Sequence, residues 1–379
     1  MPKRALGINV FEAALYRIES LYKEGHRLIL SFSGGKDSGV CLELMLMAAK
    51  RTNRLPVEVV MRDEEIMFPG TFEYCERVYR RPEVKFHWLV AGQPIIHSFN
   101  RENPYWWVFD PSHEDKWVRQ KPSWVIHIKE QNIGQMVTDK KFPPPAGKQL
   151  FSVLGLRTSE SRNRKMGLMS SGDFVTKVGE WGVRLARPIY DWGDDDVWKS
   201  IYDNKWDYNS AYDVMHRVGM SKNKLRIAPP TMYQSIDSLK YALKAWPKWF
   251  DKVNTRVGGM RTAANFGKRA IRPIRKISES WEDCGKRIFT SHNSPEWIIK
   301  RYEIAKSKAL GYHSRHSTQE LAQNIQCGRC FPSMGSWKDL VENFYMGDPW
   351  SQFYTQLPYM EPEFFRKGSG YWGGKPAFA

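Results

Sequence analysis

The sequence SFSGGKDS at residues 31–38 constrains the fold of this chain more than any other stretch. It follows an apolar run at residues 28–30 and precedes an apolar-periodic segment at residues 40–47, which predicts a strand, a tight turn and then a helix. The adjacent Gly34 and Gly35 can adopt positive φ and let a ligand approach the backbone. The first turn of the helix offers N–H groups without helical acceptors, at the positive end of the helix dipole. The stretch therefore predicts an anion site that suits phosphate.

Polar side chains surround these glycines. Ser31, Ser33 and Ser38 contribute hydroxyls, Lys36 contributes a cation and Asp37 contributes a carboxylate. An ordinary strand–helix turn would also contain glycines, but it would not need these side chains at these offsets. The Walker A pattern is excluded, because it requires Ser or Thr directly after the lysine and this chain has Asp37 there.

The order of predicted elements indicates an α/β fold with a parallel twisted sheet and helices on both faces. Strand–helix–strand units imply right-handed crossovers, and ligands in such sheets bind beyond the carboxyl ends of the strands. Asp63 follows the second strand and is expected to face the ligand, whereas a solvated acidic loop would explain Glu64 and Glu65 equally well. Helices are expected at residues 8–22, 36–50 and 72–80, and strands at 27–32, 57–61 and 84–90.

A second polar cluster follows a buried strand that is expected at residues 150–156. Gly155 lies at the end of this strand, and Arg157, Glu160 and Arg164 follow it. Arginines are costly to place in a core, whereas guanidinium groups bind phosphate oxygens bidentately. A surface helix with an ion pair between Glu160 and Arg164 is the alternative. It does not explain why these charged residues directly follow the end of a strand.

The chain is expected to form two domains. Residues 1–210 carry the strand–helix units, and a loop-like aromatic segment at residues 100–149 is expected to be an insertion that covers the active site. Residues 175–188 are consistent with a hairpin, and the acidic residues 194–196 are expected to begin a helix rather than to bind a metal. Residues 211–379 are expected to form a basic, mainly helical C-terminal domain.

The net charge of +17 and the pI near 9.5 suggest a polyanionic partner, most often a nucleic acid. Charge alone also fits a protein that merely has a basic surface. Residues 252–278 contain no acidic residue, and either a backbone contact to nucleic acid or a solvated basic face would explain them. Trp246, Trp249 and Phe250 could stack bases, but their helical spacing fits core positions better. The basic residues of the segment are Lys252, Arg256, Arg261, Lys268, Arg269, Arg272, Arg275 and Lys276.

Five cysteines are few for 379 residues, which fits a reducing cytoplasm better than a disulfide scaffold. Neither a secretory signal nor a membrane span is expected. Cys327 and Cys330 form a C-x-x-C pair, which fits half of a zinc or iron–sulfur site, a redox pair or two buried thiols. Cys284 is the expected third ligand, and the candidates for a fourth are His292, His313 and His316.

Four motifs in this order resemble the phosphoadenosine phosphosulfate reductase family of the N-type ATP pyrophosphatases, in the adenine nucleotide alpha-hydrolase superfamily. The resemblance is closest to the branch of the immunoglobulin-binding regulator A proteins, which phages and mobile elements often encode. It covers residues 8–210 and extends more weakly over residues 212–215 and 226–230. The motifs are SGGKDS at 33–38, Asp63 with FPGT at 68–71, GLR at 155–157 with Glu160, Ser161 and Arg164, and PIYDW at 188–192 with DVW at 196–198.

This resemblance implies that the loop holds the β and γ phosphates of ATP on its amides and on Lys36, and that Asp37 holds Mg²⁺. Arg157 and Arg164 would neutralise charge that develops at the α phosphate, and Asp63 would lie near the adenosine. ATP would be split into AMP and pyrophosphate, and AMP would pass to an acceptor oxygen. The expected acceptor is a nucleic acid, DNA or RNA, with sulfur insertion as in the thiolating branches of the superfamily.

Two other interpretations remain open at the level of the sequence. Reduction of a sulfonucleotide would need a nucleophilic thiol in the C-terminal Glu-Cys-Gly-Leu/Ile-His motif of the reductases. The sequence lacks this motif, because Asp283 precedes and Lys286 follows the Cys284–Gly285 pair. A regulator or defence component that uses nucleotide binding as a switch, together with a partner protein, is the other interpretation. No helix-turn-helix is identified, which disfavours direct reading of a DNA sequence.

Overall fold

The computed structural model of the chain describes residues 7–91, 95–97, 99, 105–128, 136–160, 162–294, 296–330 and 334–346. The chain divides into two compact units. Of the described residues, the first unit contains residues 7–91 and 119–228, and the second contains residues 95–118 and 229–346, with the gaps given above. The unit that holds the sheet thus continues beyond residue 210, while the functional division at that point stays a prediction.

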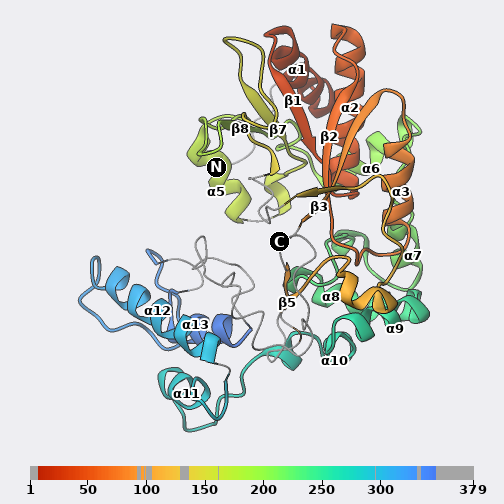
Figure 1. Ribbon diagram of the computed structural model, residues 1–379. Coiled ribbons are helices and arrows are strands. Elements are labelled where there is room, and N and C mark those ends of the chain that lie inside the picture. Colours follow the sequence, from red (N-terminus) through yellow and green to blue (C-terminus); the bar gives the residue numbers. More distant parts are fainter. Residues whose placement is uncertain are drawn as a thin grey trace. The chain divides into compact units, whose positions relative to one another are not determined.

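The first unit is built on one six-stranded sheet in the order β6-β3-β2-β1-β7-β8, and all of its neighbouring strands pair in parallel. Figure 1 shows these strands side by side, with α1 and α2 next to them. The predicted α/β fold class is therefore confirmed. The strands are β1 (Arg27–Ser31), β2 (Val57–Asp63), β3 (Val84–Ala91), β6 (Ile126–Ile128), β7 (Leu150–Val153) and β8 (Val183–Ala186).

The topology reverses next to β1. The chain adds β2, β3 and β6 on one side of β1 and then returns to place β7 and β8 on the other side. Leu30 in β1 accordingly pairs with Val59 in β2 and with Val153 in β7. Open parallel sheets bind their ligands in a crevice at the carboxyl ends of the strands, at such a switch point. The segments that leave β1 and β7 therefore meet at the expected ligand site.

Alternation along the strands divides the core between the two faces of the sheet. Leu28 and Leu30 belong to the larger cluster, which also contains buried residues of the helices beside the sheet. Ile29 points to the opposite face, where a smaller cluster includes Met136 and Phe142. The helices of the larger cluster are α1 (Val10–Lys23), α2 (Lys36–Thr52), α3 (Thr71–Tyr79) and α6 (Asp194–Asp203).

Two segments differ from the prediction: one has more regular secondary structure than expected and the other has less. Residues 100–149 were expected to be loop-like, but they contain β5 (Tyr105–Trp106), the 3-10 helix η1 (Pro111–Lys116) and β6, which becomes an edge strand of the sheet. Residues 100–104 and 129–135 of this segment lie outside the described part. The expected hairpin at residues 175–188 is reduced to β8 and one antiparallel bridge between Val175 and Ala186.

The remaining described elements of the first unit connect or follow these strands. Between β7 and β8 lie the 3-10 helix η2 (Thr158–Glu160) and α5 (Arg162–Ser171). After α6 come α7 (Ala211–Arg217) and the 3-10 helix η3 (Lys222–Lys224). Among the described residues, no helix is both long and apolar enough to cross a membrane.

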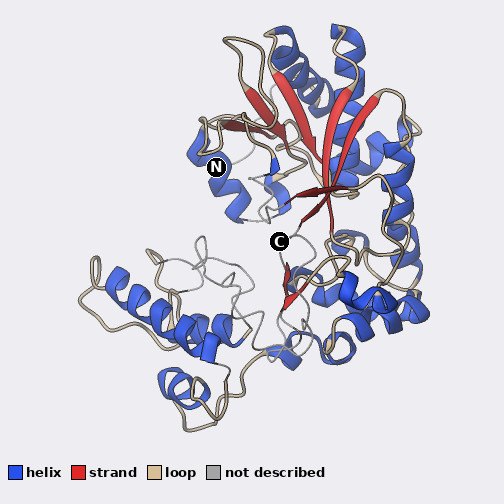
Figure 2. Ribbon diagram, in the orientation of Figure 1, coloured by secondary structure: helices blue, strands red, loops and turns tan. Residues whose placement is uncertain are grey.

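The second unit is mainly helical, as predicted (Figure 2). Apart from β4 (Ile95–Ile96) and β5, which pair with each other, its described regular elements are helices. Trp281, Ile298 and Leu340 belong to the apolar core that joins the last three of them. The helices are α8 (Ile236–Ala245), α9 (Pro247–Arg256), α10 (Met260–Phe266), α11 (Trp281–Ile288), α12 (Glu296–His313), α13 (Trp337–Tyr345) and the 3-10 turns η4 (Tyr233–Ser235) and η5 (Gly267–Ile271).

The basic segment at residues 252–278 is partly neutralised inside this unit. Arg256 is fully buried, and its guanidinium donates a hydrogen bond to the carbonyl of Trp107. The Lys268 ammonium lies 3.2 Å from the Asp237 carboxylate. Arg256 therefore has a structural role and cannot be a surface contact to nucleic acid.

Candidate functional site

The glycine loop between β1 and α2 is tightly packed against the protein. Gly34 has a φ of +70°, and a Cβ atom there would lie 2.9 Å from both the Cys75 Sγ and the Thr71 Cγ2. Gly35 is the N-cap residue of α2 and supplies no side-chain acceptor. The conformation and close contacts of Gly34 require glycine. Because Gly35 supplies no side-chain cap, the Lys36 N–H in the first turn of α2 bonds instead to the Tyr212 hydroxyl.

The loop serines stabilise its shape. The Ser33 and Ser38 hydroxyl oxygens lie 3.1 Å apart, and Ser38 Oγ donates to the Gly35 carbonyl at 3.0 Å. Ser31, at the end of β1, instead shares a 2.9 Å hydrogen bond with Ser152 of β7. The structure thus brings Ser33 and Ser38 into the loop itself and leaves Ser31 on the sheet beside it.

The segment after β7 packs directly on the start of α2. A Cβ atom on Gly155 would lie 2.7 Å from the Asp37 carbonyl carbon and 2.8 Å from the Ser38 nitrogen, so the position requires glycine. This close approach brings Arg157 over the loop, where its Nε donates to Asp37 Oδ1 at 2.6 Å. The two motifs that the sequence places far apart therefore form one site.

Asp194, the first residue of α6, completes the centre of this site. Its Oδ1 accepts from Arg157 Nη2 at 2.7 Å and lies 3.3 Å from Lys36 Nζ. Burial opposes its ionisation, but Lys36 and Arg157 outweigh burial and hold the pKa of its carboxyl below the ordinary value. The sequence predicted only a helix start here. Asp196, rather than Asp194, caps the start of α6, because its carboxylate accepts a hydrogen bond from the Gly193 N–H at 2.6 Å.

A second group of charges adjoins the first. Glu160 forms an ion pair with Arg164 and lies 4.0 Å from Arg157, while Arg226 donates to the Glu160 carbonyl at 3.1 Å. Burial and the neighbouring Arg226 and Arg157 lower the pKa of Arg164, against an opposing effect of Asp37. The whole site contains four cations and three carboxylates: Lys36, Arg157, Arg164 and Arg226 against Asp37, Glu160 and Asp194.

Residues after α6 hold the loop from a third direction. The Tyr212 hydroxyl accepts from the Lys36 N–H at 2.9 Å, and Asn209 Nδ2 donates to the Gly34 carbonyl at 2.9 Å. Lys36 Nζ donates to the Leu225 carbonyl at 3.2 Å. Sequence reasoning missed these three residues, although the weak extension of the resemblance over residues 212–215 was a signal for Tyr212.

A match to a known sequence family identifies the family of this chain. The phosphoadenosine phosphosulfate reductase domain matches residues 27–262, which include every part of this site. The chain belongs to the phosphoadenosine phosphosulfate reductase domain family. Its glycine loop, Gly155 and Arg157 all lie inside the matched range.

Three known proteins are similar to this family member. The uncharacterized protein YbdN of Escherichia coli is 26% identical over 383 residues, covering 94% of this chain and 92% of YbdN. The adenosine 5'-phosphosulfate reductase of Salinibacter ruber is 20% identical over 151 residues, covering 40% of this chain and 50% of the reductase. The Candida glabrata FMN adenylyltransferase, solved with FAD and inorganic pyrophosphate, aligns with a TM-score of 0.35 at 13% identity, covering 55% of this chain and 63% of that chain.

Asp63 is the last residue of β2, whereas the sequence placed it just after the strand, and its carboxylate is fully buried. Oδ2 accepts from Trp88 Nε1 at 2.8 Å, and Oδ1 accepts from the Glu65 N–H at 2.8 Å and from Arg119. Both oxygens are thus engaged by the protein. The expectation that Asp63 lies near an adenosine stays a prediction, with its carboxylate acting as a support for the strand end.

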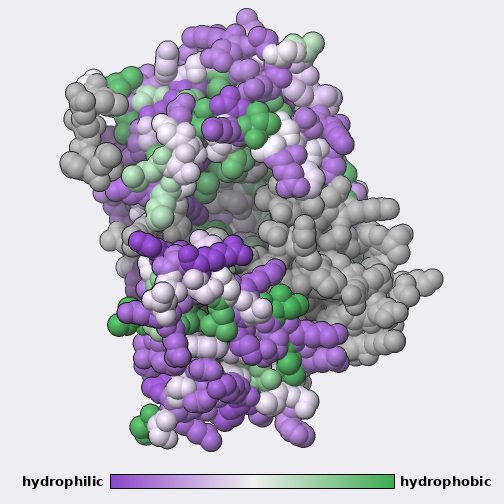
Figure 3. Space-filling model, turned by 90° about the vertical axis from the view of Figure 1, so that its left-hand side faces the viewer, coloured by the Kyte–Doolittle hydropathy of each residue, from purple (hydrophilic) through white to green (hydrophobic). Residues whose placement is uncertain are grey.

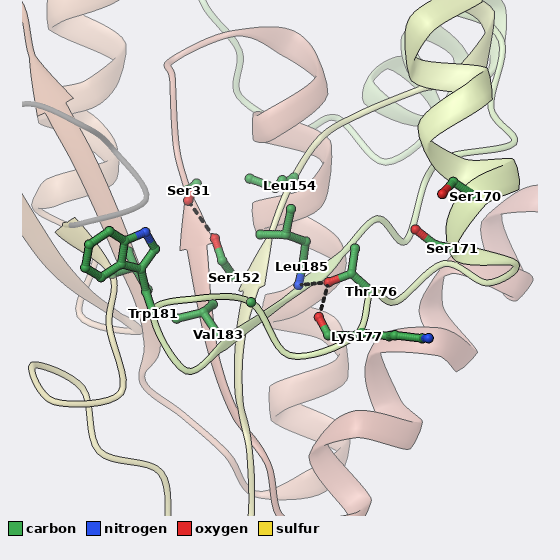
Figure 4. A pocket seen from close by; sticks show the side chains of 12 residues that line it. Ser31, Ser152, Leu154, Ser170, Ser171, Thr176, Lys177, Trp181, Val183 and Leu185 are labelled. Carbon is green, nitrogen blue, oxygen red and sulfur yellow. Dashed lines mark hydrogen bonds between the residues drawn. The ribbon is translucent and has the colours of Figure 1, made fainter. Parts of the chain in front are cut away.

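A pocket of about 740 Å³ lies against β1, β7 and β8, where Ser31, Ser152 and Val183 line it together with residues of the segment 170–181. Figure 4 shows the bonded Ser31 and Ser152 hydroxyls on one wall and Trp181 and Lys177 on the segment before β8. Hydrophilic residues cover much of the side of the molecule seen in Figure 3, with smaller groups of hydrophobic residues between them. The pocket has the size and mixed lining of a small-molecule site.

The cysteine prediction needs a correction in its ligand set. The Cys327 and Cys330 thiols gather with the His313 and His316 imidazoles in the second unit, with all four ligand atoms within 4.8 Å of one another. Cys284 does not belong to this group. It is buried in the core of α11, where burial raises the pKa of its thiol. The proposed third ligand was wrong because spacing along the sequence does not show which face of a helix a cysteine occupies.

Proposed function

We propose that this chain cleaves ATP between its α and β phosphates and transfers AMP to an acceptor oxygen. The observation that carries the proposal is the contact of Arg157 with Asp37, which joins the end of β7 to the glycine loop at the topological switch point. Amides at a helix start beside an arginine guanidinium are suited to bind pyrophosphate. The guanidinium can also neutralise charge that develops at the phosphorus under attack.

The excess of positive charge supports an anionic ligand. Burial and repulsion from the neighbouring Arg226 and Arg157 lower the pKa of the Arg164 guanidinium. A triphosphate would relieve the repulsion by giving each guanidinium an oxygen to bind. In this proposal Lys36 and the loop hold the β and γ phosphates, while Arg157 and Arg164 hold the α phosphate. The catalytic effect is then mainly orientation and charge stabilisation.

The carboxylates of the site fit a magnesium ion. Asp37 and Asp194 both bind the guanidinium of Arg157, so their hard oxygen donors converge on one region that is partly open to solvent. Asp37 is the proposed Mg²⁺ ligand, with Asp194 as a second one. When bound, Mg²⁺ supplies neutralisation of phosphate charge. The residues of the chain orient the phosphates and keep the loop in place.

The acceptor is proposed to be a nucleic acid, and the pocket beside Ser31 is proposed to hold a nucleoside or acceptor group. The net charge of +17 supports a polyanionic acceptor. Sulfur incorporation after adenylation, and membership in the immunoglobulin-binding regulator A branch, are finer proposals that rest on the resemblance of the sequence motifs.

Reduction of a sulfonucleotide is disfavoured by the thiols near the loop. Cys41 and Cys75, the described cysteines of the first unit, are both fully buried, and burial raises the pKa of each thiol. A neutral buried thiol is a poor nucleophile. Cys75 Sγ instead packs beside Gly34, which gives it a structural role in the loop.

The test is the product of ATP labelled in the α phosphate, incubated with Mg²⁺ and with or without DNA or RNA. The proposal expects AMP and pyrophosphate, with turnover increased by the correct nucleic acid and lost in Asp37→Ala. ADP and phosphate as products would overturn it. Nucleotide binding without turnover under every condition would favour a nucleotide-switched regulator instead.

A further inference from the structure

A compact group of metal-binding side chains lies in the second unit, apart from the residues proposed to bind nucleotide. His313 is the last residue of α12, and His316 follows in the next turn. Cys327 and Cys330 form a tight turn, in which the Cys330 N–H donates to the Cys327 carbonyl at 3.2 Å. Two short segments thus each contribute a pair of ligands spaced three residues apart.

We propose that His313, His316, Cys327 and Cys330 bind a single zinc ion that fixes the loop between α12 and α13 to the end of α12. This inference does not depend on the proposed nucleotide chemistry. Two thiolates and two imidazoles are a ligand set that zinc takes in tetrahedral structural sites.

The distances between the ligand atoms fit one metal ion. Zinc bonds of about 2.3 Å to sulfur and about 2.0 Å to nitrogen separate the ligands of a tetrahedron by roughly 3.3–3.8 Å. His313 Nδ1 lies 3.3 Å from Cys330 Sγ, and His316 Nε2 lies 3.5 Å from both Cys330 Sγ and Cys327 Sγ. A two-iron cluster would place the cysteines and the histidines on different irons and would need a wider arrangement.

The surroundings orient the ligands. His313 Nε2 lies 3.1 Å from the Gln319 carbonyl, so the proton of this imidazole is held on Nε2 and Nδ1 is left to face the thiols. The Cys327 N–H donates to the Gly335 carbonyl at 2.8 Å, which anchors the C-x-x-C turn to the start of the last helix region. Such outer contacts are the usual support of a zinc site.

The local fold explains why a metal would be needed. Within residues 314–330, Leu321 and Cys330 are the described residues with buried apolar side chains, so this segment contributes little to the hydrophobic core. Backbone bonds from Trp337 to Ala322 at 2.9 Å and from Lys338 to Gln323 at 3.0 Å hold its middle, and the Cys327–Gly335 bond holds the C-x-x-C turn. Zinc would fix its two ends. Four protein ligands leave no open position, which predicts a structural rather than a catalytic ion.

The direct test is metal analysis of the purified full-length chain, followed by replacement of the metal with Co²⁺. We expect about one zinc per chain, no iron, and a cobalt spectrum with strong tetrahedral d–d bands and thiolate-to-cobalt charge transfer. Absence of zinc together with absence of a tetrahedral cobalt spectrum would overturn the proposal. So would iron with acid-labile sulfide, or a zinc-free chain with a disulfide between Cys327 and Cys330.

Variants separate the ligands from neighbouring groups. Cys327→Ser and His316→Ala should lose the metal, whereas Cys284→Ala, which removes a buried thiol of the same core, should keep it. His316→Cys guards against simple misfolding, because it preserves four nitrogen or sulfur ligands. It should retain the metal and increase the charge-transfer absorption of the cobalt form. Equal loss of metal in Cys284→Ala, or an unchanged cobalt spectrum in His316→Cys, would contradict the proposed ligand set.

Discussion

The two ends of the sheet in the first unit both carry charged clusters, and they differ in how those charges are paired. Near the amino ends of the strands, Glu58 of β2 is bound bidentately by Arg27 of β1, with both contacts at 2.8 Å. At the carboxyl ends, Arg157 is shared between Asp37 and Asp194, and further arginines are gathered around Glu160. The first cluster converges on the single carboxylate of Glu58, which Lys85 and His87 also approach, while the second spreads four cations over three carboxylates.

This difference separates stability from function within one sheet. A bidentate pair at the amino edge needs no ligand, and it ties β1 to β2. The carboxyl edge lies at the switch point of the topology, where parallel sheets bind their ligands. We therefore expect changes at the amino edge to lower stability and leave catalysis intact, and changes at the carboxyl edge to abolish catalysis.

The largest effect is expected from Arg157→Ala. Arg157 is 2% exposed, and its loss leaves the Asp37 and Asp194 carboxylates close together with Lys36 as the cation that they still share. Formation of AMP should fall by about 10²- to 10³-fold, and the free energy of unfolding should fall by about 3 kcal/mol. Labelled-ATP assays and urea unfolding measure the two effects.

Arg27→Ala is the matched control at the amino edge. It should lower the free energy of unfolding while AMP formation per folded molecule stays at the wild-type level. A loss of AMP formation in Arg27→Ala equal to that in Arg157→Ala would remove the distinction between the two edges.

Gly155→Ala should have the next largest effect, because the added methyl would overlap the backbone of Asp37 and Ser38. Displacement of the loop should cost about 2 kcal/mol of stability and most of the AMP formation. Thermal unfolding and the labelled-ATP assay measure both. Gly167→Ala in α5 is the control, because a Cβ atom there meets nothing within 4 Å. It should be neutral or slightly stabilising, and a similar loss in both variants would contradict the close packing of Gly155.

The pH dependence of stability tests the amino edge alone. Burial opposes ionisation of Glu58, but His87 and Arg27 outweigh it and hold the pKa of the carboxyl at about 2. A carboxyl whose pKa is lower in the folded state stabilises the protein above its unfolded pKa of about 4.3. This contribution, ~2 kcal/mol, is lost as the pH falls toward 2. Urea unfolding between pH 6 and about 2.5 should therefore show a steeper loss for the wild type than for Glu58→Gln, and parallel curves would contradict it.

The smallest effect is expected from Tyr212→Phe. This change removes the acceptor of the Lys36 N–H at the start of α2 and leaves a buried donor unpaired. The cost in unfolding free energy should be about 1–2 kcal/mol. Tyr208→Phe is the control, since its hydroxyl bonds to Asp213 in a partly exposed position and its loss should cost less. Equal costs, measured by urea unfolding, would show that Tyr212 has no special part in holding the loop.

The sequence predicted the parts of this site that are local along the chain. The glycine loop, its serines and its helix could be inferred because strand, turn and helix follow one another within residues 27–52. Arg157 could be inferred because a charged run after a buried strand needs a ligand. Asp194 and Tyr212 could not, because their roles depend on where α6 and α7 pack. The same limit applied to the second unit, where the C-x-x-C and the candidate histidines were visible, but the grouping of both His313 and His316 with it, without Cys284, needed the fold of α11 and α12.

The most direct measurement of the central claim uses two ATP analogues, each with one bridging oxygen replaced by a methylene group. If the site cleaves between the α and β phosphates, β,γ-methylene-ATP should yield AMP and methylenediphosphonate, and α,β-methylene-ATP should remain intact in the presence of Mg²⁺ and nucleic acid. Release of phosphate from the α,β-methylene analogue, with no cleavage of the β,γ-methylene analogue, would contradict the account.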